Sequence, residues 1–359
     1  MSDPVYKRLC ETMARRGGLY QGVDIPEFYE LVETLFTPEE AALSNVMPKG
    51  FNTAGAIATE LGKDELYISY ILEEMANKGL CVGVKIKGEM VYGGPPFVPG
   101  IFEFQFMRGT STERDKKVAK LIKNYKAAYD RGLEQPKEAF PVARVITIDR
   151  TIGAGNTIHT YDQIKTYVEK YNRLAVTTCY CRHQAKLVDA SDNCEKPNEV
   201  CMQFGVGAQF VIDRGMGRKV TREEALEILR RSEAAGLVHA TFNRQEIDFL
   251  CNCCSCHCVM IKKALAFPKP GLVMNSGFQP TWNKDLCTAC ETCIDRCPMS
   301  ALYMGDADLP VLNLDLCIGC GICATGCPEK AIAMVAKEGF PAPPLDRKAL
   351  KEAMQTADN

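Results

Sequence analysis

Cysteines are concentrated in one part of this sequence, where their spacing could support metal chemistry. Only Cys10 and Cys81 fall in the first 178 residues, whereas the other 17 of the 19 lie between Cys179 and Cys327. A disulfide framework is typical of small secreted chains, and this chain has 359 residues and no apolar N-terminal segment. Clustered thiols in such a chain more often bind metal, which requires that they stay reduced. We therefore expect metal cofactors and a low-potential, anaerobic setting.

Two cysteine runs near the C-terminus share one spacing, Cys-x2-Cys-x2-Cys-x3-Cys-Pro. One extends from Cys287 to Pro298 and the other from Cys317 to Pro328, and the dipeptide Asp-Leu precedes both. This repetition indicates an internal duplication. A tight loop can present three thiolates to three corners of a cubane cluster, but the fourth corner needs a thiolate from the opposite side. The proline then turns the chain away from the fourth cysteine.

In these two runs the sequence resembles the bacterial-type 2[4Fe-4S] ferredoxins, over about 55 residues. The resemblance implies two [4Fe-4S] clusters, each bound by three cysteines of one run and the last cysteine of the other. One cluster would bind Cys287, Cys290, Cys293 and Cys327, and the other would bind Cys317, Cys320, Cys323 and Cys297. Zinc is the alternative metal, but it prefers two Cys-x2-Cys pairs at each tetrahedral site.

A further group of cysteines begins where a predicted strand over residues 174–178 ends. Cys179 and Cys181 form a Cys-x-Cys motif that is followed by Arg182 and His183. With two later cysteines they could hold a third [4Fe-4S] cluster, and Arg182 would offset its negative charge. That four-thiolate set would be Cys179, Cys181, Cys194 and Cys201. The alternative is a structural zinc ion on the same ligands, or with His183 replacing one of them.

The densest group places five cysteines and a histidine within eight residues. Its members are Cys251, Cys253, Cys254, Cys256, His257 and Cys258. Reduced thiols this close together would be vulnerable to oxidation unless some of them bind metal. At least one cysteine remains beyond the four that a cubane needs, and the sequence does not determine which one. A fourth [4Fe-4S] cluster, an exchange-active disulfide pair and a site-differentiated catalytic cluster are the three interpretations.

Taken together, these cysteine patterns resemble the large ferredoxin-type proteins of strict anaerobes, over residues 50–335. The resemblance implies an electron-transfer subunit that works beside a dehydrogenase or reductase. We therefore expect low-potential electron transfer through several [4Fe-4S] clusters. The alternatives are a catalytic reductase with its cluster at Cys251–Cys258, and a redox-sensing DNA-binding regulator.

The rest of the sequence predicts the elements that must position these cysteines. Two helices at 54–61 and 64–78, then a hairpin of strands at 81–86 and 90–92, resemble a winged helix. Further along, the pattern predicts helices at 113–131, 161–171 and 221–235 and strands at 141–148 and 174–178. The expected fold is α+β, with a helical and winged-helix-like domain at 1–106, a middle α/β cysteine-rich domain at 107–280, a ferredoxin-type dicluster domain at 281–335 and a tail at 336–359.

Charge and hydropathy narrow the range of partners. The formal net charge is -2, from 43 basic and 45 acidic side chains, which gives no reason to expect a polyanion. The segment from Glu60 to Lys78 carries five acidic residues against only two basic ones, Lys63 and Lys78, whereas DNA recognition needs a basic helix. No run of about 18 apolar residues exists that would span a membrane. We expect a cytoplasmic protein that works with other redox proteins or oxidoreductase subunits, without nucleic acid; a homo-oligomer is compatible with the sequence.

Overall fold

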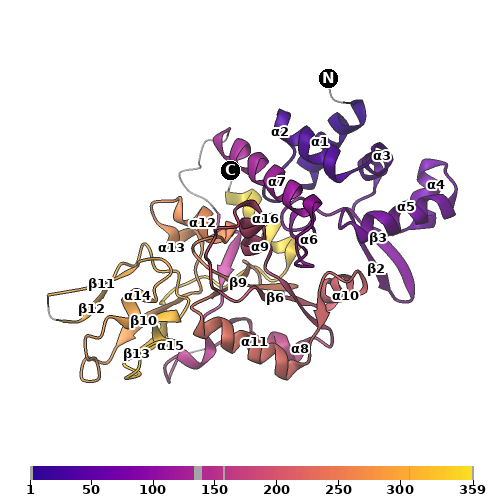
Figure 1. Ribbon diagram of the computed structural model, residues 1–359. Coiled ribbons are helices and arrows are strands. Elements are labelled where there is room, and N and C mark those ends of the chain that lie inside the picture. The colour runs from indigo at the N-terminus through magenta and orange to yellow at the C-terminus, as the bar shows by residue number, and fades with distance from the viewer. Residues whose placement is uncertain (1–2, 133–139, 157, 307, 358–359) are drawn as a thin grey trace. The chain divides into compact units, whose positions relative to one another are not determined.

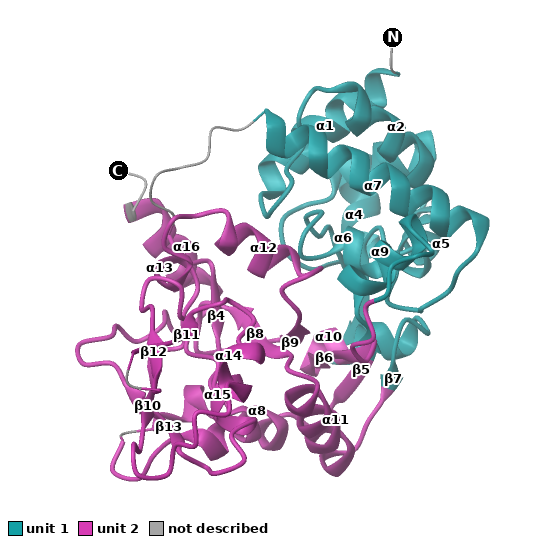
Figure 2. Ribbon diagram, turned by 60° about the vertical axis from the view of Figure 1, so that its left-hand side comes forward, with its two compact units in different colours: residues 1–135, 177–193, 209–218 teal, residues 136–176, 194–208, 219–359 magenta. Residues whose placement is uncertain are grey.

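The computed structural model describes residues 3–132, 140–156, 158–306 and 308–357, and it has the expected α+β composition (Figure 1). The chain forms two compact units, each built from separate stretches of sequence (Figure 2). Unit 1 comprises residues 1–135, 177–193 and 209–218, and unit 2 comprises residues 136–176, 194–208 and 219–359. The domain boundaries expected from the sequence remain predictions. Within the described residues, no helix is both long enough and apolar enough to cross a membrane.

Unit 1 is mostly helical, and its helices begin where polar caps or prolines precede apolar residues. Its helices are α1 (Pro4–Arg16), α2 (Pro26–Leu35), α3 (Pro38–Val46), α4 (Ala54–Leu61), α5 (Glu65–Asn77), α6 (Ile101–Phe104), α7 (Glu113–Arg131) and α9 (Tyr180–Val188). Thr37 and Thr112 each form a capping box, in which the threonine hydroxyl and an acidic side chain three residues later satisfy backbone N–H groups at the helix start. The cap at Thr112 explains why the helix predicted at 113–131 coincides with α7.

The helix–hairpin segment of unit 1 has the predicted elements. After α4 and α5 the chain forms β2 (Val82–Ile86) and β3 (Glu89–Gly93), which pair antiparallel. The short strand β1 (Asn52–Thr53) adds to the other edge of β3, so the sheet order is β1-β3-β2. The aromatic core of unit 1 includes Phe97, whose ring stacks on that of Phe102 with centroids 4.7 Å apart.

Unit 2 contains most of a six-stranded sheet with strand order β4-β8-β9-β6-β5-β7. Its strands are β4 (Ala143–Val145), β5 (Leu174–Thr178), β6 (Glu199–Phe204), β7 (Arg218–Lys219), β8 (Val238–Phe242) and β9 (Phe249–Cys253). Strand β9 pairs antiparallel with β6 on one side and with β8 on the other, so it is an interior strand. Helices α8 (Ile164–Lys170), α11 (Arg222–Ala234), α12 (Val259–Leu265) and α13 (Pro270–Val273) accompany this sheet, while α10 (Gly205–Asp213) lies across a unit boundary.

The last part of unit 2 consists of two small antiparallel sheets and two one-turn helices. One sheet pairs β10 (Phe278–Trp282) with β13 (Ile332–Ala336), and the other pairs β11 (Leu302–Met304) with β12 (Pro310–Leu312). The one-turn helices are α14 (Thr292–Asp295) and α15 (Ile322–Thr325), and Figure 1 shows them among these strands in the orange part of the chain. The tail beyond them ends in helix α16 (Arg347–Ala357), and the backbone N–H of Gln245 donates to the carbonyl of Pro344 at 2.8 Å.

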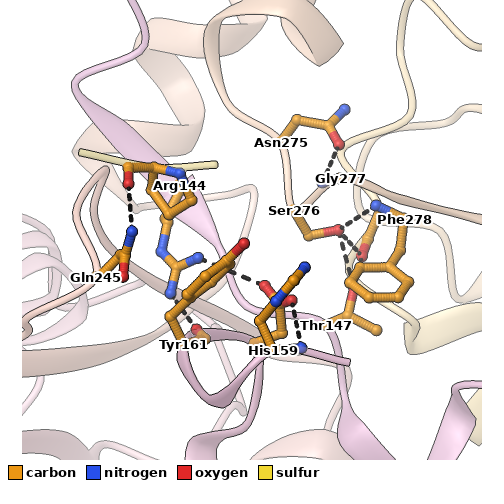
Figure 3. Close-up of polar contacts among 12 residues, drawn as sticks. Arg144, Thr147, His159, Tyr161, Gln245, Asn275, Ser276, Gly277 and Phe278 are labelled. Atoms are coloured by element: carbon orange, nitrogen blue, oxygen red, sulfur yellow. Dashed lines mark hydrogen bonds and ion pairs between the residues drawn. The ribbon is translucent and has the colours of Figure 1, made fainter. Parts of the chain in front are cut away.

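A buried arginine connects the edge of the large sheet to the segment that precedes α8. Arg144 of β4 is only 3% exposed, and its guanidinium lies 3.7 Å from the carboxylate of Asp162 and stacks over the ring of Tyr161 (Figure 3). It also donates to the backbone carbonyl of Tyr161. Burial lowers the pKa of Arg144 and raises that of Asp162, while their mutual attraction opposes both shifts. Each of these two buried charges is therefore tolerated only because the opposite charge lies beside it.

Replacing Arg144 should destabilise unit 2 strongly. In the variant Arg144→Met the Asp162 carboxylate stays buried without its cation, which should lower the free energy of unfolding by about 3–5 kcal/mol. Denaturant unfolding of oxygen-free protein measures this loss, and Arg144→Met/Asp162→Asn should recover part of it. The exposed pair Lys165–Glu169 is the matched control, since Lys165→Met should change the free energy by less than about 1 kcal/mol. Equal losses in Arg144→Met and Lys165→Met would contradict the interpretation.

Candidate metal centres

The two cysteine runs occupy equivalent places in a duplicated strand–loop–strand arrangement. Strand β10 precedes the first run and β11 follows it, while β12 precedes the second run and β13 follows that one. Because β10 pairs with β13, and β11 with β12, the strand entering each loop pairs with the strand leaving the other. This exchange holds the two loops close to each other.

Hydrogen bonds repeat between the two halves. The side chains of Asn283 and Asn313 each accept the N–H of the aspartate two residues later, both at 3.0 Å. At the end of each run a backbone N–H points at the sulfur of the fourth cysteine, from Ala301 to Cys297 and from Ala331 to Cys327, both at 3.2 Å. N–H groups aimed at sulfur stabilise thiolates and the clusters they bind. The duplication seen in the sequence therefore extends to the backbone contacts.

Each loop contains two residues in the left-handed backbone region on either side of its second cysteine. In the second loop these are Gly319 and Gly321, with φ of 69° and 80°, and in the first they are Ala289 and Glu291, with φ of 53° and 58°. Left-handed residues bend the chain tightly enough for three cysteines to face one space. Gly319 is also required for space, because a Cβ there would collide with the carbonyl oxygen of Phe278 and the hydroxyl of Ser276.

Two cavities lie at these loops. The cysteines lining the first are Cys287, Cys290, Cys293 and Cys327. The cysteines lining the second are Cys297, Cys317, Cys320 and Cys323. These are the two interleaved sets that the ferredoxin resemblance implies. Four thiols around one shared space is the donor set that a cubane cluster needs, so the residues fit [4Fe-4S] clusters.

Comparison with known proteins agrees with this geometry. Residues 286–332 match the family model of the 4Fe-4S dicluster domain. This segment is a 4Fe-4S dicluster domain. Searches of curated proteins and of solved structures found no significant match to the chain. The protein therefore carries [4Fe-4S] clusters as its cofactors, within a larger chain that contains further cysteine groups.

The two cavities of the dicluster domain differ in their access to solvent. In the first, Cys290 is exposed, and a hydrogen bond with the hydroxyl of Thr292, 3.4 Å away, lowers the pKa of its thiol. In the second, burial raises the pKa of Cys320 to about 12 and also raises the pKa of Cys323 well above its ordinary value. Exposure is one of the properties that set a cluster's reduction potential. Among the cysteines that line the two cavities, Cys290 of the first is the exposed one.

Polar side chains outside the dicluster domain hold its second loop. The Ser276 hydroxyl contacts the hydroxyl of Thr147 at 2.8 Å and the N–H of Phe278 at 3.1 Å (Figure 3). Both hydroxyls also donate to the carbonyl of Gly319. The side chain of Asn275 donates to the carbonyl of Cys317 at 3.0 Å. The sequence pattern does not indicate that Thr147, Asn275 and Ser276 contact this loop, because these contacts form only in the folded chain.

The first loop is attached to the rest of unit 2 through Arg296, the residue before Cys297. Its guanidinium donates to the carbonyls of Glu233 and Ala234 at 3.0 and 3.2 Å. Those carbonyls belong to the last turn of α11, where helical C=O groups lack partners within the helix and favour a cation. Arg296 thereby fixes the position of Cys297 relative to the second cavity.

The structure divides the eight-residue cysteine string into two groups. Cys253 Sγ lies 3.1 Å from Cys258 Sγ, and Cys251 contacts Cys253, whose pKa these contacts and burial raise. The others join Cys194 instead: the potential ligand atoms of Cys194, Cys254, Cys256 and His257 all lie within 4.8 Å of one another. The sequence placed Cys194 with a different set, and no local signal indicated this grouping.

The remaining predicted ligands are distributed between the units. Cys201 lies in β6 of unit 2, next to Met202, which pairs with Leu250 of β9. Cys179 and Cys181 lie at the start of α9 in unit 1, where His183 contacts the carbonyl of Thr110 at 2.7 Å. The four-thiolate set of Cys179, Cys181, Cys194 and Cys201 remains a prediction, since its members belong to both units.

The collision at Gly319 leads to a test of the second cavity. We expect Gly319→Ala to lose the cluster of that cavity, because the added Cβ displaces the loop from Phe278 and Ser276, and iron should fall by about four atoms per chain. The matched control is Ala289→Gly at the equivalent position of the first loop, which should retain all its iron. Iron and acid-labile sulfide assays on oxygen-free protein measure both variants. Full iron in Gly319→Ala would show that the loop tolerates a side chain.

A lysine beside the second cavity should influence its reduction potential. Lys337 is half-buried, which lowers its pKa, and its charge acts on Cys317. A nearby positive charge favours the more negative, reduced state of a cluster. Lys337→Met should therefore lower one of the two midpoint potentials, by tens of millivolts as an order of magnitude. Redox titration followed by electron paramagnetic resonance measures the shift. Lys351→Met on α16 is the control, and an equal shift of both potentials would contradict the assignment.

Proposed function

We propose that this protein transfers electrons one at a time through several [4Fe-4S] clusters, as a subunit or partner of an oxidoreductase in an anaerobic cytoplasm. The observation that carries the proposal is the pair of cavities, each lined by four cysteines drawn from both runs. A [4Fe-4S] cluster bound in such a cavity supplies a one-electron redox centre.

The chain holds the two cavities close enough for rapid transfer. Cys293 lines the first cavity and lies in α14, whereas Cys297 lines the second cavity and follows two residues after that helix ends. Only four residues therefore separate these ligands of the two cavities. Cys293 and Cys323, one from each cavity, are buried in the same small hydrophobic cluster. Apolar packing between the cavities keeps water out and limits rearrangement when charge moves.

A third redox centre adjoins the second cavity. Cys253 and Cys258 are buried in the same hydrophobic cluster as Cys317, and Cys251 packs against it. Continuing the β6–β9 register by one residue places Cys201 opposite Cys251. Opposite residues of an antiparallel pair point to the same face, with Cβ atoms about 5 Å apart. We propose that Cys201, Cys251, Cys253 and Cys258 bind a third [4Fe-4S] cluster, in place of the four-thiolate set expected from the sequence. A path would then lead from the exposed Cys290 inward.

The winged-helix-like part of unit 1 is proposed as a docking module for a protein partner. Its sheet order and two preceding helices support that resemblance. Helix α5 carries Glu65, Glu73 and Glu74 and no basic residue, which argues against contacts to phosphates.

Metal analysis of oxygen-free protein tests the electron-transfer proposal. We expect about 12 iron and 12 sulfide per chain, and an uptake of one electron per cluster from dithionite without any substrate. In Cys253→Ser, iron should fall by about four atoms, whereas Cys10→Ser in unit 1 should keep all of it. A chain that binds no iron, or that takes up no electrons reversibly, would contradict the proposal.

The second candidate is a redox dithiol at the same place, favoured by the 3.1 Å contact between the sulfurs of Cys253 and Cys258. Their oxidation would form one S–S bond and release two protons and two electrons. The dicluster domain would supply or accept those electrons singly. About 8 iron per chain, with two thiols that become unreactive after oxidation and recover on reduction, would favour this candidate over the third cluster.

A further inference from the structure

The local backbone separates neighbouring residues of the string at Cys251–Cys258. In strand β9 side chains alternate between faces, so Cys251 and Cys253 share one face while Asn252 takes the other. Asn252 there accepts a hydrogen bond through its Oδ1 from the Nδ1–H of His239, 2.6 Å away. After the strand, residues 255–257 form a turn, and Cys258 caps the start of α12. The turn carries Cys254, Cys256 and His257 away from the face that holds Cys251, Cys253 and Cys258.

A fourth potential ligand reaches this turn from far away in the sequence. Cys194 Sγ lies 3.8 Å from Cys256 Sγ, although 62 residues separate them, and Cys254 Sγ lies 3.9 Å from His257 Nδ1. All four ligand atoms are within 4.8 Å of one another. All four residues belong to unit 2.

These distances suit one metal ion rather than a cluster. A tetrahedral zinc ion with Zn–S bonds of about 2.3 Å sets its sulfur ligands about 3.8 Å apart. A cubane instead places each thiolate on a different iron atom, so a cavity for the whole cluster must lie between the four thiolates, as in the dicluster domain. Three thiolates and one imidazole are a donor set that zinc favours, whereas magnesium and calcium prefer oxygen.

We propose that Cys194, Cys254, Cys256 and His257 bind a single zinc ion in a closed tetrahedral site. Four protein ligands leave no position open for substrate, so the role is structural. Cys194 is the first residue of the segment with which the chain re-enters unit 2. The ion therefore fastens that segment to the turn between β9 and α12 and fixes the neighbouring thiols of Cys253 and Cys258. The proposal stands independently of the electron-transfer function.

Zinc and iron are measured together on the full-length protein, purified without oxygen from medium containing both metals. We expect about one zinc per chain in addition to the iron. X-ray absorption at the zinc edge should show three sulfur ligands near 2.3 Å and one nitrogen near 2.0–2.1 Å, which are the usual bond lengths. This measurement uses the unaltered protein and does not depend on whether a variant folds. Absence of zinc, or a shell of oxygen ligands, would overturn the proposal.

Variants then assign the ligands. Cys194→Ser and His257→Ala should each lose the zinc and keep the full iron and sulfide content. Ser255→Ala, in the same turn but outside the donor set, should keep both metals. Loss of about four iron and four sulfide in Cys194→Ser or His257→Ala, with zinc unchanged, would show that these residues hold a cluster and would overturn the zinc site. That result would leave the electron-transfer proposal intact, so the two can fail separately.

Discussion

A cubane cluster needs thiolates on all its corners, and one tight loop cannot surround it. This constraint explains the architecture of the dicluster domain. Each loop must borrow its fourth cysteine from the other, so neither cavity is complete by itself. The paired strands β10–β13 and β11–β12 meet that requirement, because each sheet joins the entry of one loop to the exit of the other. Left-handed residues on both sides of the second cysteine then aim three side chains inward.

The two halves of the domain are symmetric in backbone but not in surroundings. The second loop is held by Thr147, Asn275 and Ser276, which come from other parts of unit 2, and its cysteines are largely withdrawn from water. The first loop keeps an exposed cysteine and charged neighbours such as Glu291. In the proposed electron-transfer function, the exposed Cys290 would mark the end at which a partner approaches.

The sequence predicted those features that depend on local spacing. Cysteine spacing implied both four-thiolate sets, and capping residues and apolar periodicity located α4, α5, α7 and α11. It could not divide the string at Cys251–Cys258, because that division depends on where β9 ends and the turn begins. It also could not place Cys194, because this residue contacts Cys256, which lies 62 residues later in the sequence. Tertiary contacts of this kind leave no periodic trace in a sequence.

The interleaving of the units has a consequence for how the protein is made. Unit 1 takes its last segments from residues 177–193 and 209–218, after the chain has already begun unit 2. At 5–20 residues per second, a ribosome needs roughly 4–17 s to move from residue 135 to residue 218. During that interval the N-terminal helices lack the later segments of unit 1, since segments of the two units alternate along the chain. The cysteines of the dicluster domain, Cys287 to Cys327, are synthesised after both of those segments.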